Sequence, residues 1–179
     1  MKRITKNAAN IYLEFSNNLD GDQCNKLGWM YDNGLGLLQD FTEAIKWFKK
    51  AVEKGNSGAM LNLGFMYKYG RGVVKNDKSA MNWYQNAAKA GNIKAMYSIG
   101  NMYDVGDGVE QNYTEAMKWY RDASERGNSN AMFCLGSMYE YGSGIPKDMK
   151  EAIRWYKKAF ENGNEEAKDK LRRLGIADS

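Results

Sequence analysis

A tryptophan recurs at a spacing of 36 residues, and this period constrains the fold more than any other feature of the chain. The four tryptophans in phase are Trp47, Trp83, Trp119 and Trp155. Two sets of glycines keep the same spacing: Gly28, Gly64, Gly100 and Gly136, then Gly55, Gly91, Gly127 and Gly163. A fixed period of this length indicates copies of one supersecondary unit. The chain is therefore predicted to be a stacked array of four units, with its core between neighbouring copies.

Each unit is predicted to contain two helices joined by a glycine loop, as the second copy shows. Residues 57–69 carry apolar side chains at helical spacing, and Gly70 and Gly72 end this helix because glycine accepts left-handed backbone angles. Residues 77–90 show a second helical pattern, with Gly91 as its C-cap. The unit is therefore a helix, a glycine loop, a second helix and a tight turn.

The start of the second helix is marked in every copy by a residue type that caps helix N-termini well. These residues are Asp40, Asn76, Asn112 and Asp148. In three copies a glutamate follows three residues later, which resembles a capping box. These glutamates are Glu43, Glu115 and Glu151. Recurrence in phase argues against a chance Asp or Asn in a loop.

The two ends of the chain fit the same pattern as half-repeats. Residues 1–20 match a second helix and are predicted to form an N-terminal capping helix, and residues 165–179 match a first helix and are predicted to form a C-terminal one. Between these caps lie four repeats, at residues 21–56, 57–92, 93–128 and 129–164. We predict one all-α domain over residues 1–179, a solenoid of ten helices with no strands.

The repeated residues resemble the Sel1-like repeat, a relative of the tetratricopeptide repeat with a longer internal loop. The pattern is A-x-x-x-L-G-x-M-Y-x-x-G-x-G-V, then D/N-x-x-x-A-x-x-W-Y-x-x-A, then G-N, over about residues 22–164. The first copy departs most, with Gln23, Cys24 and Leu37 at pattern positions. The resemblance implies a right-handed superhelix of antiparallel helix pairs and a role as an adaptor or scaffold, as for similar proteins in bacteria. It implies no shared catalytic residues.

One face of the first helices varies between copies and is the candidate binding site. The constant positions of these helices fall in one arc of the helical wheel, and the variable positions fall in the opposite arc. The resemblance implies that first helices line the concave side, so the variable face is expected to form a groove. The candidate partner-binding residues are Trp29, Leu61, Phe65, Tyr69, Tyr97, Asn101, Phe133 and Tyr141. Exposed aromatic clusters are typical of surfaces that bind a protein or peptide. The alternative is that these rings pack on adjacent first helices and bind nothing.

A second surface, on the outer face of the second helices, is rich in lysine and arginine. Its basic residues are Lys46, Lys49, Lys50, Lys54, Lys89, Lys118, Arg121, Arg126, Arg154, Lys157 and Lys158. This face is an alternative docking surface for an acidic protein, nucleic acid or an anionic membrane. The other interpretation is an ordinary solvated helix face. No nucleic-acid-binding motif is present, which argues against a nucleic-acid reader. A structural role through self-association stays open beside the favoured monomer.

The composition argues against an enzyme. The chain has no histidine, and its net charge is only +4. Cys134 is expected to face the groove, but no histidine is present to activate it. Cys24 and Cys134 lie three repeats apart, so both are predicted to be free thiols in a reducing compartment. No cofactor or metal ligand set is predicted. With no apolar run of signal-peptide or membrane-span length, we predict a cytoplasmic protein.

Overall fold

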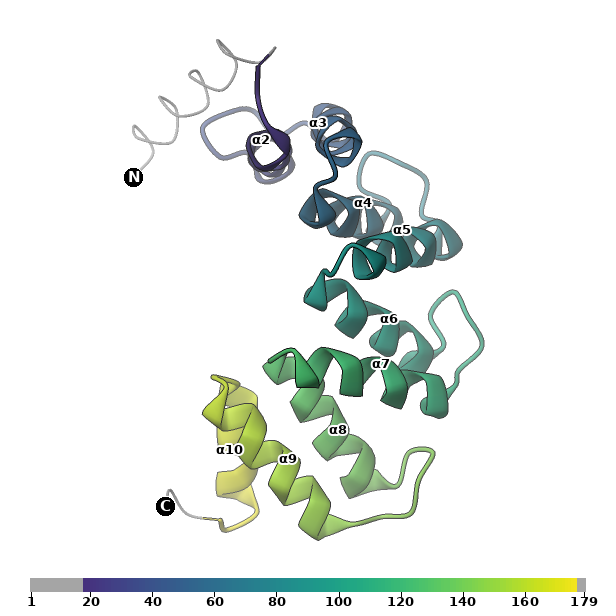
Figure 1. The fold of residues 1–179 in the computed structure, drawn as a ribbon, viewed down its shortest axis with the longest axis vertical. Helices are drawn as coiled ribbons and strands as arrows, with labels where there is room; N and C mark the ends of the chain where they lie inside the picture. The colour runs from purple at the N-terminus through teal and green to yellow at the C-terminus, as the bar shows by residue number, and fades with distance from the viewer. Residues whose placement is uncertain (1–17, 177–179) are drawn as a thin grey trace. The chain divides into compact units, whose positions relative to one another are not determined.

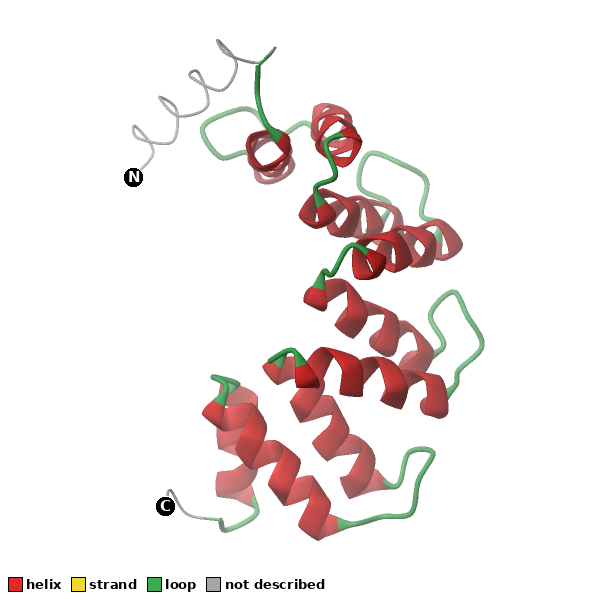
Figure 2. Ribbon diagram, viewed as in Figure 1, coloured by secondary structure: helices red, strands yellow, loops and turns green. Residues whose placement is uncertain are grey.

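The structure is a computed structural model that describes residues 18–176 (Figure 1). Nine helices and no strand occur within these residues (Figure 2). The predicted N-terminal capping helix falls on residues 1–20, and residues 1–17 lie outside the described part of the chain. The chain divides into two compact units, unit 1 at Met1–Asn92 and unit 2 at Ile93–Ser179. This division falls between the second and third predicted repeats.

Unit 1 contains two helix pairs. Helix α2 (Gly21–Asn33) packs on α3 (Phe41–Glu53), and α4 (Ser57–Tyr69) packs on α5 (Asp77–Lys89). Helix α3 also contacts α4, so the two pairs stack on each other. The loops that follow α2 and α4 return Leu37 and Val73 to the core of this unit. These contacts explain why an apolar residue follows each pair of loop glycines.

Unit 2 contains two more helix pairs and a final single helix. The pairs are α6 (Ile93–Val105) with α7 (Tyr113–Glu125), and α8 (Ser129–Tyr141) with α9 (Met149–Glu161). Helix α10 (Glu165–Arg173) packs on α9 and buries two apolar side chains, Ala167 and Leu171. It therefore forms the helical part of the predicted C-terminal cap.

The predicted caps of the second helices are confirmed, but the predicted capping boxes are not formed. The side chains of Asp40, Asn76, Asn112 and Asp148 all accept hydrogen bonds from backbone N–H groups of the first turn. The glutamates Glu43, Glu115 and Glu151 pair instead with the basic residues three positions later, at 2.6, 2.6 and 3.1 Å. A capping box does form at the start of α2, between Asp20 and Gln23. An exposed basic side chain one turn away thus competes with the helix terminus for the glutamate.

A buried ring from each second helix lies against a glycine of the first helix in the same repeat. These rings belong to Phe48, Tyr84, Tyr120 and Tyr156, each at most 1% exposed. A Cβ added at Gly100 would lie 2.7 Å from the Tyr120 ring, and one added at Gly136 would lie 2.6 Å from the Tyr156 ring. Any larger residue would therefore push the two helices of a repeat apart.

The tryptophans that reveal the period fill less of the core than the rings that follow them. Trp47 is 6% exposed, whereas Trp83, Trp119 and Trp155 are only partly buried. Trp83 and Tyr84 are both expected to fill the space between repeats, and Trp83 does pack against the core of unit 1 while part of its ring stays exposed. The fully buried ring is that of Tyr84.

Candidate functional site

In unit 1 the variable face of the first helices exposes two large aromatic side chains. Trp29 of α2 is 48% exposed and Tyr69 of α4 is 63% exposed. Phe65 is half-buried: its ring stacks beside Tyr69, with centroids 6.3 Å apart, and meets the buried Tyr84 ring edge-on at 5.5 Å. Leu61 is buried, at 6% exposed, so this candidate is not available on the surface.

In unit 2 the equivalent face has the same construction. Tyr141 is 59% exposed, while Tyr97, Asn101 and Phe133 are half-buried. The Tyr97 ring lies 5.9 Å from that of Tyr120, and the Phe133 ring lies 5.2 Å from that of Tyr156. The half-buried rings of both units thus rest one edge or face on the buried tyrosine of their own repeat. This support holds each ring in place while part of it remains at the surface.

The acidic side chains near the ends of the first helices serve the fold. Asp32 lies 2.8 Å from Arg71, whose guanidinium also donates to the Asp32 carbonyl oxygen at 3.0 Å. The Tyr120 hydroxyl donates to Asp104 at 3.2 Å. Burial raises the pKa of both aspartates, although Arg71 acts against this at Asp32 and the Tyr120 hydrogen bond acts against it at Asp104.

Glu140 is the most strongly held of these carboxylates. The Tyr156 hydroxyl donates to it at 2.6 Å, and the Lys170 ammonium lies 2.8 Å away. Burial opposes ionisation of Glu140, but these hydrogen bonds outweigh it and lower its pKa. Glu140 therefore links α8, α9 and α10.

Cys134 sits on the variable face, but its surroundings keep the thiol protonated. Burial raises its pKa to about 11, and burial also raises the pKa of the neighbouring Tyr97 to about 12. Cys24 is buried, whereas Cys134 is partly exposed, and burial raises the pKa of Cys24 as well. A thiol with a raised pKa is a poor nucleophile at neutral pH, so neither cysteine has the character of a catalytic group.

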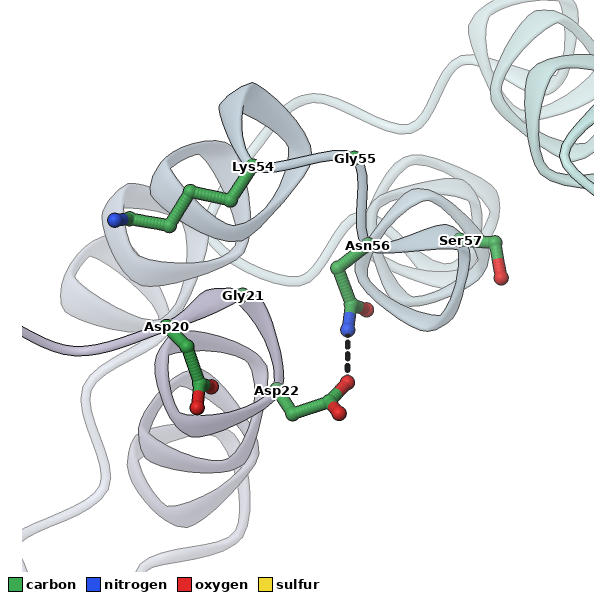
Figure 3. A pocket seen from close by; sticks show the side chains of 7 residues that line it. All are labelled: Asp20, Gly21, Asp22, Lys54, Gly55, Asn56 and Ser57. Carbon is green, nitrogen blue, oxygen red and sulfur yellow. Dashed lines mark hydrogen bonds between the residues drawn. The ribbon is translucent and has the colours of Figure 1, made fainter.

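The described surface includes two hollows that bear on the candidate site. The first, of about 500 Å³, lies in unit 1 where α3 turns into α4 beside the start of α2 (Figure 3). All of its lining residues are polar or glycine: Asp20, Gly21, Asp22, Lys54, Gly55, Asn56 and Ser57. The amide of Asn56 donates to Asp22 at 2.6 Å across it, as Figure 3 shows. This hollow contains none of the candidate residues.

The second hollow, of about 300 Å³, lies between α8 and α10 of unit 2 and includes the candidate Phe133. Its other lining residues, Glu166, Asp169, Lys170 and Arg173, come from α10. None of these four residues was among the predicted candidates, because residues 165–179 were expected only to cap the array. Glu166, Lys170 and Arg173 lie one period after Asn130, Cys134 and Ser137. That phase places them on the variable face and would have identified them.

The basic face of the second helices is exposed but partly neutralised. Lys46, Lys118 and Arg154 each pair with the glutamate one turn earlier. The ammonium groups of Lys50 and Lys158 lie 4.0 and 4.6 Å from the ring centroids of Trp47 and Trp155. Several of the basic side chains are thus engaged with groups of their own helix.

Two further properties follow from the described residues. None of the helices among residues 18–176 is both long and apolar enough to span a membrane. Across the same residues, no cluster of three or more histidine, cysteine, aspartate or glutamate side chains has the arrangement needed to hold a metal ion.

Comparison with known families gives four matches to one family model, described as Sel1 repeat. They cover residues 24–56, 57–92, 93–128 and 129–164. No curated protein sequence matches the chain closely.

Solved structures include several similar chains. A Sel1 repeat protein from Oxalobacter formigenes superposes with a TM-score of 0.87 and 35% identity, over 96% of this chain and 73% of that one. A protective antigen of uropathogenic Escherichia coli with the same repeat fold gives a TM-score of 0.79 and 31% identity over 95% of this chain. The chain spans only 36% of that antigen. Cysteine-rich protein B of Helicobacter pylori, at 22% identity and a TM-score of 0.59 over 74% of this chain and 96% of that one, shares the fold alone. The predicted all-α repeat solenoid is confirmed.

Proposed function

Because the chain belongs to the Sel1 repeat family, we propose that it is an adaptor that binds a segment of another protein on the variable face of its first helices. Sel1 repeat proteins generally mediate protein–protein interactions. The observation that carries the proposal is the exposure of aromatic side chains on this face in both units, led by Tyr69 and Tyr141. A face that only met solvent would be expected to carry lysine and glutamate at these positions.

The support beneath these rings favours binding. Phe65, Tyr97 and Phe133 each rest on a buried tyrosine, so little side-chain freedom is lost when a partner covers them. Pre-positioned aromatic groups are the usual anchors of protein interfaces. Several shallow contacts in series correspond to a dissociation constant of roughly micromolar to high nanomolar, because ordering the partner offsets part of the contact energy.

The experiment that tests the proposal compares two double variants that remove equal numbers of exposed apolar side chains. Tyr69→Ala with Tyr141→Ala alters the proposed face, whereas Leu38→Ala with Val74→Ala alters loop residues that are 91% and 88% exposed. A partner captured from lysate of the source cells is identified and titrated against each purified variant. We expect the tyrosine variant to lose about tenfold or more in affinity, while the loop variant binds like the parent and both keep parental helical circular dichroism. Equal binding by the parent and the tyrosine variant would reject the proposal.

The basic face offers a second candidate function, electrostatic docking to an acidic partner. Its support is that Lys49, Lys54 and Lys89 are exposed and form no ion pair among residues 18–176. Binding through this face would weaken steeply between low and physiological salt. Sedimentation of the purified chain at high concentration separates both candidates from self-association, since an adaptor of this kind is expected to be a monomer. The free thiols of Cys24 and Cys134 suit a cytoplasmic location.

A further inference from the structure

The hollow between α8 and α10 combines one aromatic side chain with four charged ones. Phe133 comes from α8, and Glu166, Asp169, Lys170 and Arg173 come from α10. Its volume of about 300 Å³ is at the lower end of the range for ligand pockets and is large enough for one long side chain. All of these residues belong to unit 2.

The charges of this hollow are not equally available to a partner. The Lys170 ammonium is held by Glu140 at 2.8 Å and by the Tyr141 hydroxyl at 3.3 Å, so its charge is already neutralised. Asp169 pairs with Arg172 at 3.2 Å, but both side chains are 63% exposed, and such surface pairs are weak. These two contacts leave Glu166 as the carboxylate with no hydrogen-bond or ion-pair partner among residues 18–176.

The negative charge of Glu166 influences side chains of the variable face. This charge is one of the contributions, smaller than burial, that raise the pKa values of Tyr97 and Cys134. Its field therefore extends over the same surface that exposes the aromatic side chains. A cation placed there would meet this charge.

Other rings of α8 and α9 show how unit 2 holds cations. Lys158 lies 4.6 Å from the Trp155 centroid, Lys168 lies 5.5 Å from that of Phe160, and Lys170 lies 5.4 Å from that of Tyr141. Within the described residues, Phe133 has no such cation, although it borders two carboxylates. The face of an aromatic ring attracts a cation, and a nearby carboxylate adds to that attraction.

We propose that this hollow binds a basic side chain, arginine or lysine, of the partner segment, with its stem on Phe133 and its charged group at Glu166 and Asp169. Arg173 also lines the hollow, about two helical turns after Glu166 on α10, and repels a cation near it, which directs the basic group toward Glu166. This inference rests on the proposed function and specifies the partner: a segment that carries a basic residue beside the residues contacting Tyr97 and Tyr141.

The test uses small probes and needs no identified partner. Acetyl-arginine methylamide and its neutral isostere, acetyl-citrulline methylamide, are each titrated into the ¹⁵N-labelled full chain and followed by amide chemical shifts. The arginine probe is expected to shift amides of α8 and α10 with a dissociation constant on the order of millimolar, as suits a single side chain. Citrulline is expected to bind about fivefold or more weakly, because it lacks the charge.

Two glutamate variants of α10 make the assignment specific. Glu166→Gln is expected to lose about fivefold or more of the arginine affinity, whereas Glu165→Gln, its exposed neighbour outside the hollow, keeps parental affinity. Equal binding of arginine and citrulline, equal behaviour of the two variants, shifts elsewhere, or no shifts at ~20 mM probe would each overturn the proposal.

The outcome for the hollow can be separated from that for the adaptor. If Glu166→Gln binds the captured partner like the parent while Tyr69→Ala with Tyr141→Ala does not, the adaptor stands and the basic-residue site is rejected. If the arginine probe binds at Glu166 but the tyrosine double variant binds the partner normally, the pocket stands and the proposed face is rejected.

Discussion

Repeats 1 and 4 both bury a carboxylate near the end of the first helix, but they satisfy it differently. In repeat 4, Glu140 accepts from the Tyr156 hydroxyl at 2.6 Å and faces Lys170 at 2.8 Å. The carboxylate therefore connects its own second helix to the following helix. Because both partners donate hydrogen bonds to the carboxylate, they lower the pKa of Glu140 and favour its ionised form despite burial.

Repeat 1 has phenylalanine where repeat 4 has the tyrosine. Phe48 has no hydroxyl to donate, and the Asp32 carboxylate instead faces Arg71, from the loop after α4, at 2.8 Å and accepts a long hydrogen bond of 3.5 Å from the Asn33 amide. These contacts do not outweigh burial, so the pKa of Asp32 is raised. In repeat 3 the Tyr120 hydroxyl also donates to Asp104, yet the pKa of Asp104 is raised. The comparison teaches that the hydroxyl and the Lys170 ammonium together, rather than the hydroxyl alone, make the ionised carboxylate of repeat 4 favourable.

The largest expected effect comes from removing the buried rings. Phe48→Ala and Tyr156→Ala should each lower the free energy of unfolding by about 3–5 kcal/mol, because each leaves a cavity against a glycine. Tyr156→Ala should cost more, since it also removes a donor from Glu140. Urea unfolding followed by circular dichroism measures both, with Trp155→Ala as a less buried control. If Phe48→Ala costs as much as Tyr156→Ala, the hydroxyl network of repeat 4 adds nothing.

Breaking the ion pair of repeat 1 should have the next largest effect. Arg71→Ala removes the cation from Asp32, whose side chain is only 11% exposed, and should cost about 1–3 kcal/mol. Lys75→Ala is the matched control: its pair with Asp77 is more exposed, and it should cost under about 1 kcal/mol. Thermal melts of the two variants provide the measurement. Equal melting temperatures would mean that Asp32 does not depend on Arg71.

Removing single hydroxyls should give a smaller effect that depends on the acceptor. Tyr156→Phe loses a 2.6 Å bond to Glu140 and should cost about 1–2 kcal/mol, because the acceptor is charged. Tyr120→Phe loses a longer bond of 3.2 Å to Asp104 and should cost roughly 0.5–1 kcal/mol. Urea titrations of both variants rank them. The reverse order would show that the short contact at Glu140 is not the stronger one.

The smallest expected effect is a pH dependence of opposite sign in the two repeats. The lowered pKa of Glu140 contributes stability above its unfolded pKa, and this stability is lost as the pH falls through the folded value. The raised pKa of Asp32 has the opposite consequence, because its destabilising effect at neutral pH is relieved by protonation. Glu140→Gln should therefore lose less stability than the parent on acidification from neutral pH, and Asp32→Asn should lose more. Melting temperatures at neutral and mildly acidic pH measure the difference, and changes of the same sign in both variants would contradict the comparison.

The period predicted the fold because its positions report contacts that every repeat shares. The phase of the glycines and of residues such as Asp40 and Asn76 placed the loops and the starts of the second helices. It could not tell which of two adjacent aromatics is buried, since Trp83 and Tyr84 are both in phase. That choice depends on which ring meets Gly64 across the helix pair, a distance between helices that a helical wheel does not contain.

The candidate residues of the variable face were predicted less completely, again because a helical wheel contains no distances between helices. A wheel separates two arcs of a helix, but long side chains reach beyond their arc. Phe65 and Phe133 were assigned to the variable face of the first helices, yet each extends to a buried tyrosine of its own repeat. Leu61 was assigned to the same face and is buried. Glu166 and Arg173 are in phase with variable positions of α8, but only the position of α10 against α8 shows that they share a hollow with Phe133.

The contact between a glycine and a ring inside each repeat has a consequence for how such a gene can change length. Both members of each contact, such as Gly100 and Tyr120, are encoded within one 36-residue segment. Duplicating or deleting a whole segment leaves every glycine–ring contact of the remaining repeats intact while it changes the number of positions on the variable face. A gain or loss of one codon inside the second helix, between its first residue and the ring, would rotate the ring by about 100° about the helix axis and turn it away from the glycine. Recombination in whole segments is thus the route by which this array can lengthen or shorten its binding surface without losing its core.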